Sequence, residues 1–162
     1  MEVRPLSWRD VLYIALYMRE DDRRELYALR WDDRPETIVA AVMTDPENGW
    51  VLAFDGVPVA VVGAFPMWPG VWSVYLFATP DMTKIRFSLT RHVKKVMMPA
   101  LLEAGAHRVE CHSLKGRDDT QAWLRALGAR QQEGELVDYG RNRETFLIFY
   151  WTRTDVSLSP EG

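Results

Sequence analysis

Two titratable side chains, Glu110 and His112, are separated by one residue in the segment 106–113 (AHRVECHS). This segment is predicted to be a strand, and alternate residues of a strand face the same side. We therefore expect Glu110 and His112 on one face, where either could take a proton from an amine as a general base. The alternative is that both are merely hydrogen-bonded on a solvent-facing or helix-covered surface. Cys111, which lies between them, is expected to point the other way, into the core.

A second group of chemically useful residues follows the apolar segment 71–78. The chain then turns and continues as a helix predicted over residues 83–104, whose first turns carry Thr83, Lys84 and Arg86. Free backbone N–H groups and the helix dipole favour an anion at such a position. These residues are therefore candidates to bind an anionic ligand. The alternative is a solvated basic helix face, which is extended by Arg91, Lys94 and Lys95.

The composition limits the classes of partner and cofactor. The 162 residues are 48% hydrophobic and 27% charged, with a net charge of −3, which is typical of a soluble globular domain and does not favour nucleic acid. No apolar run approaches the roughly 20 residues of a membrane span, so no membrane partner is expected. A single cysteine excludes an intramolecular disulfide and fits a reducing compartment. The spacing of Cys111 and the three histidines does not match a metal site, so no metal is expected. His92 and His107 are expected on or beside the polar side of the long helix.

Apolar periodicity and turn residues predict the elements that position these groups. Asp55-Gly56 separates two apolar segments, which is a strong hairpin signal. Gly63, in the second of these segments, predicts a bulge or a close backbone contact. Ser7 is a predicted helix cap, and the charged run 19–24 (REDDRR) is predicted to be a solvated helix end or a turn. Further helices are predicted over residues 22–31, 35–43 and 118–127, and further strands over residues 3–6, 50–54, 57–65, 129–133 and 144–151.

Two sequence features resemble one protein family. Residues 123–129 (WLRALGA) are similar to a helix end that in the family typically reads Leu-Tyr-Glu-Lys-Leu-Gly-Phe. The Asp55-Gly56 hairpin, followed by VPVAVVGAF, resembles the second and third strands of the family. Together with the order of elements, these features resemble the GNAT (N-acetyltransferase) superfamily. The resemblance implies an α/β (α+β) domain over residues 1–151 and a tail over 152–162. Its sheet would be mixed but mostly antiparallel, with six or seven strands flanked by four or five helices.

The resemblance also implies acetyl-CoA as the cofactor. In this family a Gln/Arg-x-x-Gly-x-Gly/Ala turn between the fourth strand and the long helix holds the pyrophosphate. Backbone amides of Phe77 and Thr79 would hold the pantetheine, and the hydroxyls of Thr79 and Thr83 would replace the glycine contacts. The candidate cofactor residues are therefore Phe77, Ala78, Thr79, Thr83, Lys84 and Arg86.

This turn departs from the family pattern. Residues 78–84 contain no glycine, which would permit the close approach of backbone N–H groups to phosphate, and Asp81 adds a carboxylate. Leu124 stands where the family often has a tyrosine general acid, and Arg117 stands where it often has an asparagine. These changes predict a degenerate acyl-CoA site.

The glycine-free turn and the segments 118–128 and 139–141 resemble a degenerate branch encoded by short-tailed bacteriophages, which includes a small internal virion protein. This implies a viral protein in the bacterial host cytoplasm, or inside the phage particle, that acts by binding a host or virion protein. Trp68, flanked by Pro66 and Pro69 in a turn, is the tryptophan that is predicted to be exposed and available as a contact for a partner. The alternative is an active acetyl-CoA-dependent N-acetyltransferase that modifies a small molecule or a protein amine, with Glu110 or His112 as the base.

Overall fold

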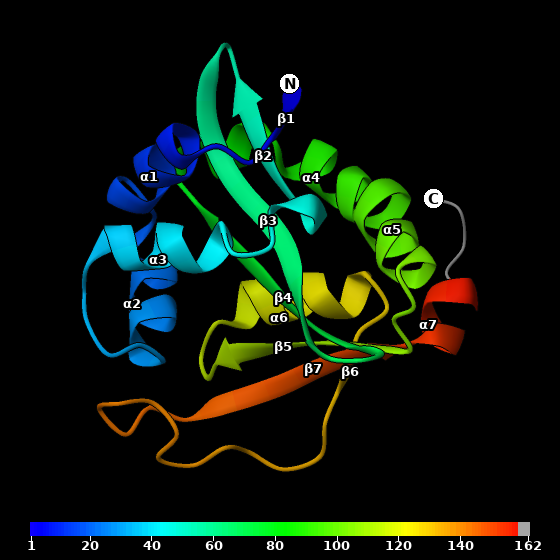
Figure 1. Cartoon of the computed structure of the whole chain (residues 1–162). Helices are drawn as coiled ribbons and strands as arrows, with labels where there is room; N and C mark the ends of the chain where they lie inside the picture. Colours follow the sequence, from blue (N-terminus) through cyan, green and yellow to red (C-terminus); the bar gives the residue numbers. More distant parts are fainter. Residues whose placement is uncertain (159–162) are drawn as a thin grey trace.

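The computed structural model describes residues 1–158, which form a seven-stranded sheet flanked by helices (Figure 1). The strand order is β1-β2-β3-β4-β5-β7-β6, and every neighbouring pair is antiparallel except β4 and β5, which are parallel. This confirms the predicted mixed, mostly antiparallel sheet. The strands are β1 (Glu2–Pro5), β2 (Gly49–Phe54), β3 (Val57–Trp68), β4 (Val71–Ala78), β5 (Arg108–Leu114), β6 (Arg130–Gln131) and β7 (Phe146–Thr152).

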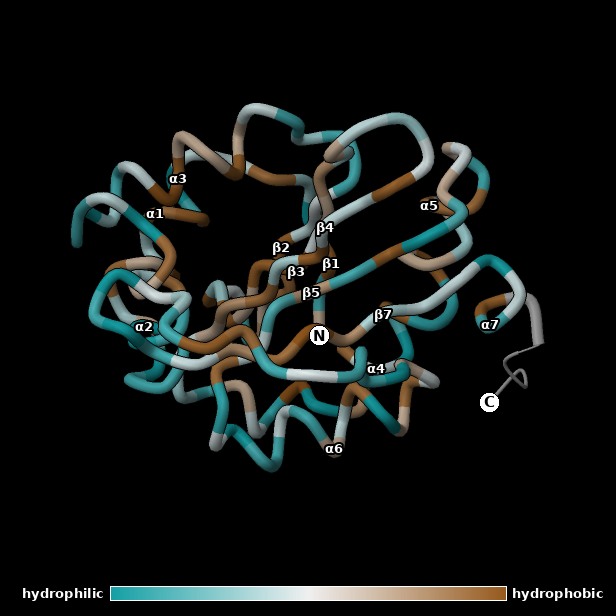
Figure 2. The backbone as a smooth tube through the Cα atoms, turned by 90° about the horizontal axis from the view of Figure 1, so that it is seen from below, coloured by the Kyte–Doolittle hydropathy of each residue, from teal (hydrophilic) through white to brown (hydrophobic). Residues whose placement is uncertain are grey.

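Helices cover both faces of the sheet (Figure 2). The apolar residues of α1 and α3 pack on one face, and those of α4, α5 and α6 pack on the other. The strands between them carry the most hydrophobic stretches of the chain, because they are buried from both sides. The helices are α1 (Trp8–Leu16), α2 (Glu20–Ala28), α3 (Pro35–Val42), α4 (Arg86–His92), α5 (Met98–Glu103), α6 (Asp118–Ala126) and α7 (Arg153–Leu158).

Helix α7 lies in the segment that was predicted to be a tail. Its Val156 packs against the core beside the sheet, so the ordered structure continues past residue 151. Residues 159–162 of the predicted tail lie outside the described residues. Five helices were predicted, and α7 is the additional one.

The helix starts follow from their capping residues. Ser7 caps α1, because its hydroxyl accepts a hydrogen bond from the Asp10 N–H at 3.2 Å, as predicted. Pro35 occupies the first turn of α3, where its missing N–H costs nothing.

The long helix begins later than predicted and is not uniform. A 3-10 turn, Pro80–Lys84, precedes α4, and a π-helical segment, Val93–Met97, separates α4 from α5. Pro99 explains the π segment, because a proline lacks the N–H of a regular helix and its ring crowds the carbonyl four residues earlier. The helix therefore widens by one residue there, and Gly105, with φ of +96°, ends it after α5.

The β2–β3 hairpin has the predicted turn. Asp55 and Gly56 both have positive φ, at 50° and 78°, which is the conformation of a type I′ turn. Strand β3 runs on to Trp68, three residues further than predicted, so the next turn is limited to two residues. Trp68 is exposed, as predicted, with an exposed fraction of 57%, and Trp31 is fully exposed as well.

Gly63 lies at a close contact, which was one of the two alternatives predicted for it; the other was a bulge. A Cβ atom at this position would collide with the Tyr75 hydroxyl and with the Asn48 carbonyl oxygen. The Tyr75 ring thus crosses directly over β3, and only glycine leaves room for it.

His92 is buried, which corrects the expectation that it lies on a polar helix side. Its ring contacts Trp50 edge-on, with 4.9 Å between the ring centroids. Its Nε2 atom has no hydrogen-bond partner among residues 1–158. Burial lowers the pKa of His92 below its ordinary value, because the charged imidazolium would lose its hydration.

We expect the burial of His92 to make the fold acid-sensitive. The unfolded chain binds a proton at His92 below about pH 6.5, whereas the folded chain does so only at lower pH. The stability from neutral burial is therefore complete above about pH 6.5 and is lost as the pH falls toward the lowered pKa. In His92→Phe, the loss of unfolding free energy between pH 7.5 and 5.5, measured by urea denaturation, is expected to shrink. It would not vanish, because burial also lowers the pKa of His112. His107→Gln is the control, since that side chain is exposed. An unchanged pH dependence in His92→Phe would contradict this account.

Candidate functional site

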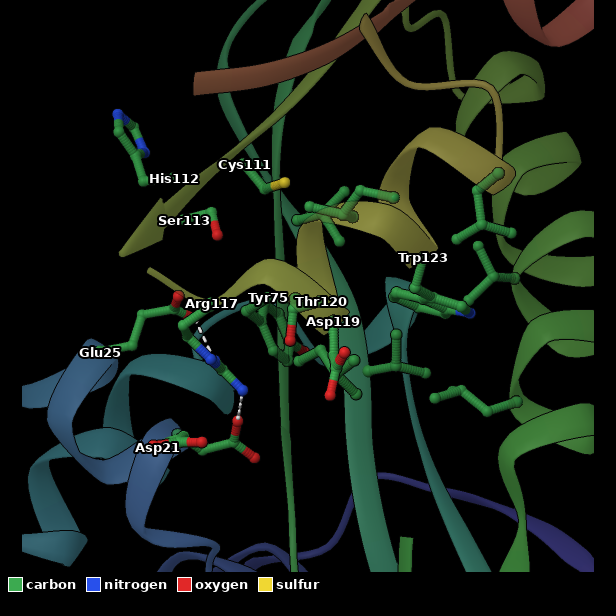
Figure 3. A pocket seen from close by; sticks show the side chains of 18 of the residues that line it. Asp21, Glu25, Tyr75, Cys111, His112, Ser113, Arg117, Asp119, Thr120 and Trp123 are labelled. Carbon is green, nitrogen blue, oxygen red and sulfur yellow. Dashed lines mark hydrogen bonds and ion pairs between the residues drawn. The ribbon is translucent and has the colours of Figure 1, made fainter. Parts of the chain in front are cut away.

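The sheet is open between its two parallel strands. Strands β4 and β5 pair at only three positions, from Val71 with Arg108 to Ser73 with Glu110, and their remaining lengths diverge. A cleft of about 940 Å³ passes through this gap. The cleft is lined from β4 by residues 73–76, from β5 by Cys111, His112 and Ser113, and from outside the sheet by α2, α4 and α6 (Figure 3).

Backbone alternation decides which amides of β4 face the gap. The Thr79 N–H donates to the Val59 carbonyl at 2.8 Å, so Thr79 points toward β3. In an antiparallel ladder every second residue does the same, which assigns Phe77 and Tyr75 to β3 as well. The prediction that the Phe77 and Thr79 amides hold a cofactor is therefore wrong in geometry. The backbone groups that point toward β5 are those of Val74, Leu76 and Ala78.

Ala78 is already engaged. Its N–H donates to Asp22 Oδ2 at 2.9 Å, and its carbonyl accepts from the Arg19 N–H at 2.8 Å. The start of α2 therefore caps the end of the open strand edge. The Ser73–Glu110 pair engages the Val74 N–H, so the stretch of β4 that is unpaired toward β5 runs from the Val74 carbonyl to Leu76.

Charged side chains connect the far ends of the two diverging strands. Arg117 donates from Nη2 to Asp22 Oδ1 at 2.8 Å and from Nη1 to Glu25 Oε1 at 2.9 Å. Glu25 Oε2 accepts from the Leu114 N–H, at the end of β5, at 2.8 Å. We call this set the Asp22–Arg117–Glu25 bridge. It runs from Ala78 on β4, through two carboxylates and one guanidinium, to Leu114 on β5. Figure 3 shows its Arg117 and Glu25 side chains joined by a dashed line.

The bridge is buried. The exposed side-chain fractions are 1% for Asp22, 10% for Arg117 and 17% for Glu25. Burial raises the pKa of Glu25, although Arg117 and the Leu114 N–H oppose the shift. Burial also disfavours the charge of Arg117, but Glu25 and Asp22 outweigh this effect and raise its pKa. The charge of Arg117 is therefore stabilised by the two carboxylates, and the charge of Glu25 is stabilised by Arg117 and the Leu114 N–H.

Sequence reasoning missed this bridge. The run 19–24 was predicted to be solvated, but Asp22 within it is buried and bonded to Arg19 as well as to Arg117. The available signal was the spacing of Arg19, Asp22 and Glu25, which places all three on one helix face. Arg117, noted only as a departure from a family pattern, is the group that this face requires.

The turn after β4 is bound to itself. The Thr79 hydroxyl accepts from the Asp81 N–H at 3.3 Å, and the Asp81 carboxylate pairs with Lys84 at 3.2 Å. Lys84 and Thr83 lie outside the cleft lining, whereas Arg86 belongs to it. Among the predicted cofactor residues, Arg86 is thus the one whose position reaches the cleft. The Phe77 side chain packs with α1 and α3 on the opposite face of the sheet.

Glu110 and His112 alternate with Cys111 on β5, and the two differ in their relation to the cleft: His112 belongs to its lining, whereas Glu110 does not. Glu110 pairs with Arg108 at 3.0 Å. The His112 ring stacks on Tyr139, with 5.6 Å between centroids, and in Figure 3 it points away from the other labelled side chains. Burial lowers the pKa of His112. Their role as a general base stays a prediction, and this placement does not favour it.

Cys111 points into the cleft (Figure 3). Burial raises the pKa of its thiol to about 12, so the side chain stays protonated and is not a nucleophile at neutral pH. It packs against the core beside α6, as expected of a small apolar residue.

The opposite half of the cleft is mostly apolar and is closed by a side-chain contact between two helices. Trp123 of α6 donates from its indole nitrogen to the hydroxyl of Thr90 of α4 at 2.9 Å. Leu124, buried beside it, also lines the cleft and supplies no proton.

Two further findings concern residues 1–158 as a whole. Within this part of the chain, no three His, Cys, Asp or Glu side chains are grouped so as to hold a metal ion. None of its helices has the length and apolar character needed to cross a membrane.

Solved acetyltransferase structures resemble this architecture, although no protein-family model and no curated protein matches the sequence. A ribosomal-protein-alanine N-acetyltransferase from Brucella melitensis is 13% identical, with 94% of this chain and 99% of that chain covered and a TM-score of 0.72. A GNAT-family acetyltransferase from Bacillus anthracis is 11% identical, with 93% of each chain covered and a TM-score of 0.69. The protein yncA from Salmonella typhimurium, described as an acetyltransferase and solved with its cofactor acetyl-CoA, is 12% identical. The match covers 93% of this chain and 92% of that chain, with a TM-score of 0.70. At these identities the likeness establishes the fold, which is that of the GNAT acetyltransferases.

Loss of the guanidinium should unbalance the bridge. Arg117→Met leaves two buried carboxylates without their cation, so we expect the free energy of unfolding to fall by about 3–5 kcal/mol in urea denaturation. Arg24→Met is the matched control, because the Arg24–Asp21 pair, at 3.9 Å, is exposed. It should cost about 1 kcal/mol or less. Equal losses in the two variants would show that the bridge is not a buried ion cluster.

Proposed function

We propose that this protein binds an acyl-CoA thioester, with acetyl-CoA as the first candidate, in the cleft between β4 and β5 and transfers the acyl group to an amine. The observation that carries the proposal is the 940 Å³ cleft through the sheet, at a strand edge of β4 that has no ladder partner from the Val74 carbonyl to Leu76. An open edge offers N–H and C=O groups to an extended ligand that contains amides, such as the pantetheine arm.

The residues of the cleft fit such a cofactor. Val74 and Leu76 present their backbone to the gap, while Trp123 and Leu124 supply apolar walls. Arg86 lies in the lining near the glycine-free turn and is the cation available to a phosphate group. When bound, the cofactor supplies an activated thioester. The chain itself orients this group along β4 and shields it from water between α4 and α6.

A second candidate function follows from two contacts that reduce the affinity of the cleft. Asp22 occupies the Ala78 N–H, and Asp81 neutralises Lys84 in the turn. These contacts favour a degenerate acyl-CoA site in a protein that acts by binding. Such a phage-encoded protein would bind a bacterial host or virion protein in the host cytoplasm or in the particle, with Trp68, exposed near the β3–β4 turn, as one contact.

Acetyl-CoA titration by calorimetry separates these candidates. Arg86→Glu is expected to weaken binding about tenfold or more, because a charge-assisted contact to phosphate is replaced by repulsion. Lys84→Glu is the matched control on the same turn, and its effect should be smaller because Lys84 is already paired with Asp81. No binding at millimolar acetyl-CoA would reject the first candidate and favour the second. Equal losses in both variants would contradict the placement of the phosphates at Arg86.

A further inference from the structure

Five carboxylates line the cleft, and they differ in what they can accept. Asp21, Asp118 and Asp119 are exposed, so water competes for any contact that they make. Asp22 and Glu25 are the buried pair, and both face the gap through the bridge. His112 also lines the cleft, but its ring stacks on Tyr139. Asp22 and Glu25 are therefore the buried proton acceptors that face an amine in the cleft.

The Asp22 carboxylate has no free hydrogen-bond acceptor position. A carboxylate accepts about four hydrogen bonds, and Asp22 accepts four: two from Arg19, one from Arg117 and one from the Ala78 N–H. Protonation would break part of this set and leave a buried cation or amide without its partner.

The Glu25 carboxylate still has free hydrogen-bond acceptor positions. Among the described residues it accepts one hydrogen bond on each oxygen, from Arg117 and from the Leu114 N–H. About half of its acceptor positions remain open, and its carboxylate lies at the cleft. Its surroundings include the Cys111 thiol, which is protonated, and Asp22, whose charge is neutralised by Arg19 and Arg117.

On the basis of the proposed acyl transfer, we propose that Glu25 is the catalytic base that takes a proton from the acceptor amine, and that Arg117 is a positioning residue that holds the Glu25 carboxylate at the cleft. The sequence alone predicted neither role. Glu25 lies on α2, across the gap from the open edge of β4, and thus on the side from which an amine can approach a thioester held along that edge.

The step balances as follows. The ammonium form of the acceptor gives one proton to Glu25, and the freed electron pair of its nitrogen forms a bond to the thioester carbonyl carbon. The C–S bond then breaks, and its electron pair leaves with sulfur as the CoA thiolate. The second proton from nitrogen passes through water to the thiolate, and Glu25 returns its own proton to solvent, so one proton is released per transfer.

Glu25→Gln tests the role of the base. It keeps the shape of the side chain and one carbonyl acceptor, for Arg117 or for the Leu114 N–H but not for both, and it cannot take a proton. With acetyl-CoA and either spermidine or a peptide with an N-terminal alanine as probes, thiol release should show kcat reduced about 10²–10⁴-fold. The KM for acetyl-CoA should stay within about twofold, since uniform binding is unaffected. The acid limb of the kcat–pH profile should disappear. Glu25→Asp should retain that limb at reduced kcat, and Glu20→Gln, on the exposed face of the same helix, should behave as wild type.

Arg117→Lys tests the positioning role. It keeps a cation but loses the forked contact to two carboxylates, so kcat should fall while the acid limb persists at a shifted pH. Urea denaturation of each variant checks that the fold is intact.

The outcomes are distinguishable. Turnover by a folded Glu25→Gln with an unchanged pH profile overturns the Glu25 assignment and leaves the proposed function standing. A wild-type protein that binds acetyl-CoA but acylates neither probe amine rejects both the acyl transfer and the base. Absence of acetyl-CoA binding rejects the proposed function at its first step.

Discussion

A single guanidinium holds together the part of this fold that the sheet does not. Strands β4 and β5 leave each other after three paired positions, and a pair of strands without ladder hydrogen bonds has no backbone reason to keep a fixed distance. Arg117, between Asp22 and Glu25, supplies that reason from outside the sheet. The cleft exists at a defined width because charged side chains on α2 and at the start of α6 replace the missing ladder.

This arrangement also explains why the bridge has three members. A lone buried carboxylate or guanidinium would lose its hydration without compensation, whereas two carboxylates around one guanidinium, each also bonded to a strand amide, satisfy one another. The spare acceptor positions of Glu25 distinguish it from Asp22. One carboxylate of the bridge is thus structural, and the other is free to exchange a proton without releasing β4.

The sequence predicted the scaffold well and the site poorly, for physical reasons. The β2–β3 hairpin, the cap at Ser7 and the contact at Gly63 are local, because each depends on a turn residue or on neighbours in a ladder. The phase of β5 was predicted correctly, but which face meets the cleft depends on how β5 departs from β4, and no local pattern records this. The amides of Phe77 and Thr79 were assigned to the wrong edge of β4 for the same reason. Asp22 was placed in solvent because its partner, Arg117, is 95 residues away along the chain.

That separation has a kinetic meaning. The contacts of Arg117 with Asp22 and Glu25 close loops of more than 90 residues, and the closure entropy of such loops must be lost before the contacts stabilise the chain. If the bridge forms after the transition state for folding, it chiefly slows unfolding and hardly affects the folding rate. The parts of the sheet that contain β4 and β5 would then form first, with the diverging ends of these two strands not yet connected by the bridge. The cleft would acquire its shape at the final step of folding. The lifetime of the ligand site would then equal the lifetime of the Asp22–Arg117–Glu25 bridge and not that of the surrounding core.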